Sequence, residues 1–471
     1  MQNLLGEINM LDFSTGLILS SQVNDPIFPN NAVTEAINVD FFKVGSVTVR
    51  KGITKLSTTV LGSTNVDGLT VFTSNSATLN YPVVAVGSAR YYFSGSGWNT
   101  ISGSFTPGSK ARFVTFGNRL FTVNGTESMK SWDGSGSWEA TNCVTGITPK
   151  FIESFKSRIY VAGDATEPDK LFFSTVISSG SVSWTTGTNF VNVNPSDNAG
   201  NITALKKCSA YLLIFKNYAM YRWDGSATQP DLLVDIGTPS QESVQLVKGI
   251  CYFFSPYGIF RTDGGYPEWI SKPVQDFIDA VPLANWAKTA AYSDDKYYEC
   301  FIGDVTVSGV SYTNVSLRID TTNQTWTVRS YAKTFRAFDR FYSSTYGAIN
   351  IGGSSDGSAY IMNYGNSDDG AVINYSIITH VVDFGRMGSN KVITDKVFIF
   401  TDKGAGSFFE AILDEQTRVP LGGSIVGQVH KISPVNLKAK QFRFKWYGQT
   451  STCQPNLNGF TFTDVKDEGY Q

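Results

Sequence analysis

The sequence predicts an all-β protein: a β-propeller of six to eight blades with a short helical insertion and a C-terminal β-sandwich domain. Three observations predict it. The 471 residues include 44 Gly, 33 Phe and 22 Tyr, and aromatic side chains suit pleated, half-buried surfaces while Gly supplies the turns between strands. A strand–turn–strand unit recurs along most of the chain, and residues 379–471 carry longer strands in strict alternation.

The recurring unit is a short apolar strand, a Gly or Asn turn, a second aromatic strand, and an Asp-Gly or Gly/Ser/Asn cluster. The units begin at Tyr81, Asn118, Ser157, Ala210, Gly249, Asp295 and Ala348. Successive starts lie 37, 39, 53, 39, 46 and 53 residues apart, close to the roughly 40–50 residues of a propeller blade. Because one unit cannot bury both of its faces alone, we expect the units to pack around a ring.

Several units end in an aromatic residue followed by Asp-Gly or in a closely related sequence. The clearest cases are Asp133-Gly134, Asp224-Gly225 and Asp263-Gly264. We expect the aromatic side chain to pack between neighbouring blades and Asp-Gly to make the tight turn that leaves the strand. Hairpins occur at similar intervals in other all-β proteins, but the matched order of strand, turn, strand and Asp-Gly favours the propeller.

Three segments are expected to flank or interrupt the repeats: residues 1–50, 271–292 and 379–471. Residues 1–50 form an N-terminal segment, which is either a strand that closes the propeller or an extended arm that grips a neighbouring subunit. The propeller then spans residues 51–378. Within it, residues 271–292 have apolar residues at helical spacing, and Pro282 divides them into two short helices joined by a bend.

Residues 379–471 are expected to form the β-sandwich. In the stretch 441–447, Phe442, Phe444 and Trp446 alternate with Arg443 and Lys445. This period of two predicts a sheet with one buried face and one wet face. The basic residues of this region, Lys438, Lys440, Arg443 and Lys445, are therefore candidates for contacts with acidic protein or DNA, with a solvated sheet face as the alternative.

The charge and the motifs exclude several classes of protein. A net charge of −2 with 17% charged residues argues against a coat for DNA or membranes, because such binding needs clustered Lys and Arg. No stretch approaches the roughly 20 apolar residues that span a bilayer. His380 and His430 are too few for a metal cluster and are expected at the surface. We predict no catalytic residue, no metal and no cofactor, and five reduced cysteines.

Four stretches of the chain resemble one family. They are a Pro/Asn-rich loop followed by AINVDFFKVGSVTVRKGITKL, the segment SFKSRIYVAGD, the helical insertion from Ser271 and the ending NGFTFTDV. Together they resemble the β-propeller virion proteins of short-tailed bacteriophages known as tail hub or nozzle proteins, or packaged-DNA stabilisation proteins.

The resemblance implies a function and a set of partners. Members of this family form a ring, typically a homo-hexamer, that extends the portal and adaptor channel, retains the packaged DNA and opens at ejection. The resemblance implies contacts with the head-to-tail adaptor or portal ring and with tail fibre, spike or needle proteins. Double-stranded DNA would pass without sequence recognition. It also implies a place in the virion tail after assembly in the host cytoplasm, and it supplies no catalytic residues.

Two functions of other classes stay open. A carbohydrate-binding or carbohydrate-active propeller would stack sugars on exposed Trp and Tyr side chains, and a cytoplasmic propeller scaffold would bind peptides. The stretch from Ser354 to Gly357 resembles the Asp-box of sialidase propellers, which is a structural turn and says nothing of an active site. A ring assembly would favour the phage protein, whereas a monomer with an aromatic pocket would favour the carbohydrate protein.

Overall fold

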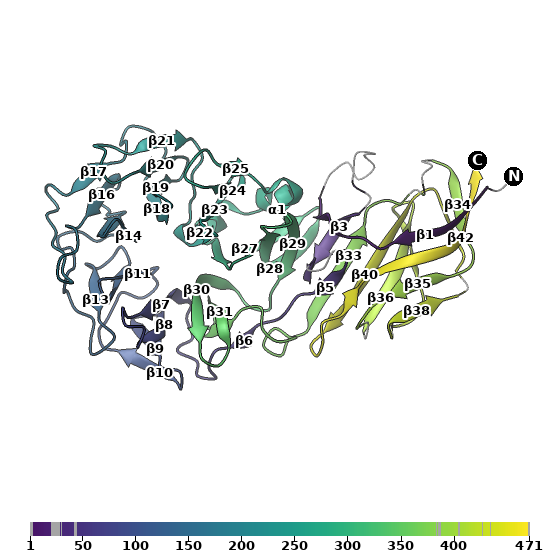
Figure 1. Cartoon of the computed structure of the whole chain (residues 1–471), viewed down its shortest axis with the longest axis horizontal. Coiled ribbons are helices and arrows are strands. Elements are labelled where there is room, and N and C mark those ends of the chain that lie inside the picture. The colour runs from purple at the N-terminus through teal and green to yellow at the C-terminus, as the bar shows by residue number, and fades with distance from the viewer. Residues whose placement is uncertain are drawn as a thin grey trace.

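The computed structural model describes residues 3–19, 29, 31–41, 45–382, 384, 388–403, 406–425, 427–433 and 435–469. The described residues are rich in strands and poor in helices, which confirms the all-β class. Figure 1 shows a lobe of small sheets arranged around a centre, which we call the ring lobe, and a second lobe of longer strands that holds both ends of the chain. Parts of the predicted segment 1–50, namely 1–2, 20–28, 30 and 42–44, lie outside the described residues.

Seven antiparallel sheets follow one another along the ring lobe. The first sheet comprises β7 (Val66–Thr73), β8 (Asn80–Val86), β9 (Ala89–Phe93) and β10 (Trp98–Ile101). The second comprises β11 (Arg112–Phe116), β12 (Arg119–Val123) and β13 (Lys130–Trp132). The third comprises β14 (Phe151–Phe155), β15 (Arg158–Ala162), β16 (Lys170–Phe173) and β17 (Phe190–Asn192). The fourth and fifth comprise β18 (Ile202–Cys208), β19 (Tyr211–Lys216), β20 (Met220–Trp223) and β21 (Asp231–Val234); and β22 (Gln245–Val247), β23 (Ile250–Ser255), β24 (Gly258–Thr262) and β25 (Glu268–Trp269). The sixth and seventh comprise β26 (Ala290–Ser293), β27 (Tyr297–Val307), β28 (Val310–Asp320) and β29 (Thr325–Ser330); and β30 (Phe335–Ser343), β31 (Gly347–Ser354), β32 (Ala359–Ile361) and β6 (Thr54–Lys55).

The innermost strands of these sheets contact one another in a closed circuit. β7, β11, β14 and β18 follow in this order, and η1 (Gln241–Ser243) and β22 lead on to β26. β26 contacts β30, and β30 contacts β7, which completes the circuit. Gly68 allows the close approach of the first two sheets, because a Cβ there would lie 2.2 Å from the carbonyl oxygen of Ala111.

The Asp-Gly turns have the predicted geometry. Gly134 and Gly225 have φ angles of 99° and 84°, in the left-handed region that favours glycine. Trp132, which precedes the first turn, packs against Phe72 of the neighbouring sheet with ring centroids 5.5 Å apart. Trp223 packs in the same way against Tyr160 of the preceding sheet, at 5.7 Å. The prediction that aromatic residues pack between neighbouring sheets is therefore confirmed at these two positions.

The helical insertion joins the fifth and sixth sheets. It contains η2 (Lys272–Val274), α1 (Gln275–Asp279) and α2 (Leu283–Trp286), and Pro282 is the N-cap of α2. The expectation of two short helices divided at Pro282 is thus confirmed. Phe277 and Ile278 of α1 are buried in the largest hydrophobic core, so the insertion is anchored at the end of the ring lobe that faces the second lobe (Figure 1).

The second lobe contains two large sheets and a small one. One large sheet has the strand order β38 (Val429–Ile432), β35 (Val397–Phe400), β42 (Gly459–Gly469), β34 (Asn390–Ile393) and β39 (Leu437–Ala439), with β1 (Asn3–Met10) also paired to β42. The other continues the sixth sheet of the ring lobe through β3 (Ala32–Ile37), β33 (Ile373–Thr379), β40 (Phe442–Thr450), β36 (Ser407–Leu413) and β37 (Thr417–Pro420), with β2 (Gly16–Leu17) beside β3. The small sheet comprises β4 (Val39–Asp40), β5 (Val47–Val49) and β41 (Asn456–Leu457).

The two large sheets pack face to face through aromatic side chains. The ring of Phe444 on β40 lies 4.5 Å from that of Phe462 on β42, and Phe409 on β36 lies 4.9 Å from Phe460. Phe442, Phe444 and Trp446 are all fully buried, whereas the alternate residues of β40 face outward. The predicted alternation along residues 441–447 is confirmed.

The N-terminal strands do not lie where a closing strand of the ring would lie. β1, β4 and β5 pair with strands of the second lobe, and β3 pairs with β33 there and with β29 of the ring lobe. The strand that completes the seventh sheet is β6, just beyond residue 50. The apolar side chains of Val33 and Ala36 explain this placement, since both are fully buried once β3 lies between β29 and β33. The predicted boundary between residues 378 and 379 falls inside β33, whose neighbours are both strands of the second lobe.

A buried cluster of three arginines and three carboxylates lies where the ring lobe meets the second lobe, and we call it the joint cluster. It consists of Arg50, Arg318, Arg329, Asp40, Glu299 and Asp368. None of these six side chains is more than 6% exposed. The three positive and three negative charges balance, as burial requires, because an unpaired ion in an apolar interior costs several kcal/mol.

Arg50 uses its whole guanidinium group within the joint cluster. It donates two hydrogen bonds to the carboxylate of Asp368, at 2.8 and 2.7 Å. Its Nε donates to the side-chain oxygen of Asn38 at 2.8 Å, and its remaining donors reach the carbonyl oxygens of Lys51 and Ser330. Arg50 therefore ties the N-terminal segment to the end of β29 and to the loop that leads into β33.

Arg329 joins the sixth sheet to the small sheet of the second lobe. Its Nη2 donates to Asp40 at 2.5 Å, and its Nη1 donates to Glu299 at 3.2 Å and to the side-chain oxygen of Asn363 at 2.7 Å. Burial alone would raise the pKa of Glu299, but Arg329 and Arg318 outweigh it and hold that pKa below its ordinary value. Glu299 is therefore ionised, and the joint cluster is held by full charges.

We predict that Arg329→Met destabilises the protein by about 3–5 kcal/mol, because the substitution leaves the buried Asp40 without its ion pair and leaves Glu299 with Arg318 alone. The free energy of unfolding from urea titration measures this. Arg261→Met is the matched control, since Arg261 and its partner Glu268 are 30% and 61% exposed and loss of such a surface pair costs at most about 1 kcal/mol. Equal losses in the two variants would contradict a stabilising role for the joint cluster.

Candidate functional site

The innermost strands of the ring lobe surround a polar pocket of about 200 Å³, which we call the axial pocket. Five of these strands each place one charged residue on it: Asp67, Arg112, Glu153, Lys206 and Asp339. None of them is predicted from the sequence. The signal was present, however, because these residues occupy the first strand of five of the seven sheets, and an alignment of those strands would have displayed the charges.

An ion pair crosses the axial pocket. Arg112 belongs to the second sheet and Glu242 precedes the fifth, yet Nε of Arg112 lies 2.9 Å from Oε1 of Glu242 and Nη2 donates to Oε2 at 3.2 Å. Burial would raise the pKa of Glu242, but Arg112 and Lys110 outweigh it and lower that pKa. A carboxylate held ionised in this way is not a general acid near neutral pH. The pair instead links the second sheet to the segment that leads into the fifth, across the axial pocket.

Two other carboxyl groups near the axis have raised pKa values. Burial raises the pKa of Asp67 and that of Asp339. The carboxylate of Asp339 accepts hydrogen bonds from the backbone N–H groups of Val71 and Arg340, both at 2.7 Å, and from the Thr70 hydroxyl at 3.0 Å. Carboxyl groups with raised pKa values in a pocket are candidates for proton transfer. In the axial pocket, Asp67 and Asp339 are such groups.

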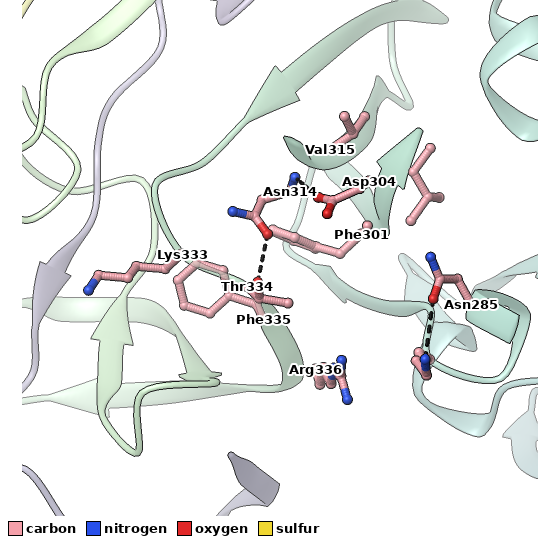
Figure 2. A pocket seen from close by; sticks show the side chains of 12 residues that line it. Asn285, Phe301, Asp304, Asn314, Val315, Lys333, Thr334, Phe335 and Arg336 are labelled. Carbon is pink, nitrogen blue, oxygen red and sulfur yellow. Dashed lines mark hydrogen bonds between the residues drawn. The ribbon is translucent and has the colours of Figure 1, made fainter. Parts of the chain in front are cut away.

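A second pocket, of about 150 Å³, lies between the sixth and seventh sheets beside α2 (Figure 2). β27 bulges here at Gly303, whose φ is 83°. Phe301 and Phe335 close the inner side of the pocket and are only 4% and 2% exposed. The side chain of Asn314 accepts a hydrogen bond from the Thr334 hydroxyl at 2.6 Å.

The lining of this second pocket is predominantly basic. Lys288, Lys333 and Arg336 contribute positive charges, and Asp304 contributes a negative one. None of these residues is singled out by the sequence, because they come from the end of the helical insertion, the bulged hairpin and the start of the seventh sheet. Only the folded chain brings them together.

Two of the predicted interface residues, Arg443 and Lys445, lie on the outer face of β40. Arg443 lies 3.6 Å from Glu415, and Lys445 lies 3.9 Å from Glu35. Both are 20% exposed at the side chain. The outward direction agrees with the predicted alternation, and nearby carboxylates offset part of the positive charge.

The other two, Lys438 and Lys440, belong to a different part of the second lobe. Lys438 lies on β39, in the sheet that contains β42, and its Nζ is 2.6 Å from Glu468. Leu437 and Ala439 on either side of it are buried in the core, so Lys438 faces outward from that sheet. Lys440 is exposed just after β39. Lys438 thus lies on one sheet, Arg443 and Lys445 lie on another, and Lys440 lies in the link between them. Their role in an interface stays a prediction.

The two histidines differ from one another. His380 is only 7% exposed, so the predicted surface position is wrong for this residue. It follows β33, and its backbone N–H donates to the carbonyl oxygen of Ala32, so the N-terminal segment lies directly beside it. His430 lies half-buried on the edge strand β38.

In the part of the chain that the structure describes, no group of three or more His, Cys, Asp or Glu residues could hold a metal ion.

The cysteines and the membrane prediction can also be compared with the structure. All five cysteines have free thiols, as expected. Within the described ranges, no helix is both long enough and apolar enough to cross a membrane.

No protein-family model matches the chain, and no curated protein matches it either.

We predict that stability falls as the pH is lowered below about 4.5, the ordinary pKa of a Glu side chain. Glu242 and Glu299 have lowered pKa values in the folded state, so their stabilising contribution is complete above the unfolded pKa and is lost as the pH falls through the folded pKa. Urea titrations between neutral and acidic pH measure the effect.

The variant Glu242→Gln should be less stable at neutral pH by about 1–3 kcal/mol, because Arg112 then lacks its anion, and should show a weaker dependence on pH. Glu139→Gln removes a half-exposed carboxylate that pairs with Arg119 and serves as the control. An unchanged pH dependence in Glu242→Gln would contradict the role given to the ion pair.

Proposed function

We propose that the ring lobe is a seven-bladed β-propeller and that the second lobe is a β-sandwich. The closed circuit of contacts between innermost strands supports the first assignment, together with the tryptophans that pack between neighbouring sheets. β6 pairs with β32 and adds an N-terminal strand to the seventh sheet, which is a common way to close a propeller. The aromatic contacts of β40 and β36 with β42 support the second assignment.

We further propose that the protein is a non-enzymatic structural component of the tail of a short-tailed bacteriophage, a tail nozzle or hub. The observation that carries the proposal is the joint cluster. Two domains in one chain ordinarily move relative to each other, but here a shared sheet and three buried arginines fix them as one body. A subunit in the wall of a DNA-retaining ring needs this stiffness. The resemblance of the four sequence stretches points to the same class of protein.

The proposal assigns a path to the DNA. The Arg112–Glu242 ion pair crosses the axial pocket of each ring lobe, and on this proposal DNA does not thread a single propeller. It would pass along the common axis of several copies, arranged as a closed homo-hexamer that continues the portal and adaptor channel. The same assembly would meet tail fibre, spike or needle proteins and would reside in the virion tail after assembly in the host cytoplasm.

A carbohydrate-active propeller is the second candidate function, and the raised pKa values of Asp67 and Asp339 favour it. A glycosidase needs one carboxyl group that stays protonated and a second that acts as base or nucleophile. Hydrolysis of a polysaccharide that is abolished in Asp339→Asn, a variant with unchanged circular dichroism, would establish this function in place of the structural one. We expect no hydrolysis.

We predict that the chain, co-expressed with the portal and adaptor proteins encoded in the same genome, forms a closed ring at the distal end of the adaptor. Cryo-electron microscopy of the purified complex measures this. The chain alone should be monomeric in native mass spectrometry, because a template supplies the geometry that closes the ring. A chain that stays monomeric beside intact portal and adaptor rings would overturn the proposed function.

The interface prediction has its own variant in the same experiment. Lys440→Glu reverses an exposed charge of the predicted interface, and we expect it to reduce incorporation into the ring. Lys207→Glu, at an exposed position on β18 of the ring lobe, is the control for charge reversal in general. Equal incorporation of both variants would remove the basic residues of the second lobe from the interface.

A further inference from the structure

We propose that the pocket beside α2 (Figure 2) binds a phosphate-type oxyanion through Lys288 and Arg336. The inference goes beyond the structural role proposed above and does not depend on it. It rests on two positive charges without a counterion, on the size of the pocket and on the inaccessibility of its aromatic rings.

Two charged residues of the pocket, Lys333 and Asp304, already have partners. Lys333 lies 3.0 Å from the carboxylate of Asp356, which neutralises it. Asp304, the carboxylate that lines the pocket, accepts a hydrogen bond from the backbone N–H of Asn314 at 2.8 Å. Figure 2 shows this contact on the side of the pocket formed by the bulged hairpin. Asp304 would repel an anion, so the remaining cations have to outweigh it.

The remaining cations of the pocket are Lys288 and Arg336. The ammonium group of Lys288 donates to the side-chain oxygen of Asn285 at 3.3 Å and has no ion pair with another described residue. The guanidinium group of Arg336 has neither a hydrogen bond nor an ion pair with the residues that the structure describes; only its backbone carbonyl is used, as acceptor for Lys110. In the joint cluster and in the axial pocket, by contrast, arginines face carboxylates.

The neighbourhood of Arg336 holds charges of both signs, because Arg336 acts on the pKa of Asp67 as well as on that of Lys110. Burial lowers the pKa of Lys110, and the charges of Arg112 and Arg336 lower it further, whereas Glu242 and Asp67 act in the opposite direction. Arg336 is therefore close enough to Lys110 to repel it. An anion in the pocket would relieve this repulsion and would give the planar guanidinium group the partner that it binds best, two oxygens of one carboxylate or phosphate.

The shape of the pocket limits the class of ligand. Its volume of about 150 Å³ is below the roughly 300–1,000 Å³ of pockets for drug-sized ligands. Phe301 and Phe335 are almost completely buried, so they offer no face on which a nucleobase or a sugar ring could stack. The site therefore suits the oxyanion itself: inorganic phosphate, or the phosphate of a nucleic acid whose base and sugar remain outside.

The experiment follows the phosphorus NMR line width of inorganic phosphate titrated with the full chain at constant ionic strength. We expect broadening that saturates with protein concentration. Arg336→Gln and Lys288→Gln should each weaken binding about tenfold, the usual effect of losing a charge-assisted hydrogen bond. Lys431→Gln, which removes an exposed charge from β38 of the second lobe, is the matched control and should leave binding unchanged.

Three results would overturn the proposal: no broadening by the wild-type chain, equal broadening by wild type and Lys288→Gln, or equal weakening in the Lys431→Gln control. Lys288 is exposed at the surface, so its variant tests the site even where Arg336→Gln fails to fold. A competition arm with duplex DNA identifies the source of the phosphate. Displacement of inorganic phosphate by DNA, lost in Lys288→Gln, assigns the site to nucleic-acid phosphates; persistence of the phosphate signal assigns it to the free anion.

Discussion

Three arginine side chains buried between the two lobes impose the main constraint on this fold. A guanidinium group that leaves water needs a carboxylate and acceptors for each of its N–H groups, or its burial costs several kcal/mol. Arg50 meets this need with Asp368, Asn38 and two backbone carbonyl oxygens, and Arg329 forms ion pairs with Asp40 and Glu299. Because these residues are hundreds of positions apart, the N-terminal segment, the sixth sheet and the loop before β33 have to come together in one arrangement.

Much of the remaining architecture follows from that arrangement. With Asp40 and Arg50 fixed at the joint, the strands β3, β4 and β5 next to them in the chain lie in the second lobe, and β6 follows at once into the seventh sheet. The N-terminal segment that carries Asp40 and Arg50 therefore also supplies β6, the strand that completes the seventh sheet of the ring lobe. A second ion pair, Arg112 with Glu242, links the second sheet to the segment that leads into the fifth. Ion pairing is not universal, since the buried Arg90 donates only to the carbonyl oxygens of Gly87 and Ala89, and Arg336 has no ion pair among the residues described.

The sequence predicts those features of the fold that depend on residues close together in the chain. The repeated units, the turns at Gly134 and Gly225, the division of the helical insertion at Pro282 and the alternation from Phe442 to Trp446 all arise from neighbouring residues, and the structure contains each of them. Pairing between distant segments is different. Val33 pairs with Thr379 in β33, and nothing in the apolar run around either residue specifies the other.

The candidate sites were less predictable for the same reason. Lys288 and Arg336 lie on separate elements, and no spacing along the chain relates them to Asp304 or to the bulge at Gly303. The predicted basic residues Lys438, Lys440, Arg443 and Lys445 are close in sequence, yet the link between β39 and β40, which holds Lys440, separates Lys438 on one sheet from Arg443 and Lys445 on another. His380 was expected at the surface because the strand that lies beside it, β3, begins nearly 350 residues earlier in the chain.

The central claim is that the joint cluster makes one rigid body of two lobes, and differential scanning calorimetry of the whole chain tests it most directly. If the lobes are coupled through the joint cluster, the chain unfolds at neutral pH in one transition whose calorimetric enthalpy equals its van't Hoff enthalpy. The variant Arg329→Met should split that transition in two. Two separate transitions in the wild-type chain, each with its own van't Hoff enthalpy, would contradict the account, because they would show that the ring lobe and the second lobe unfold independently.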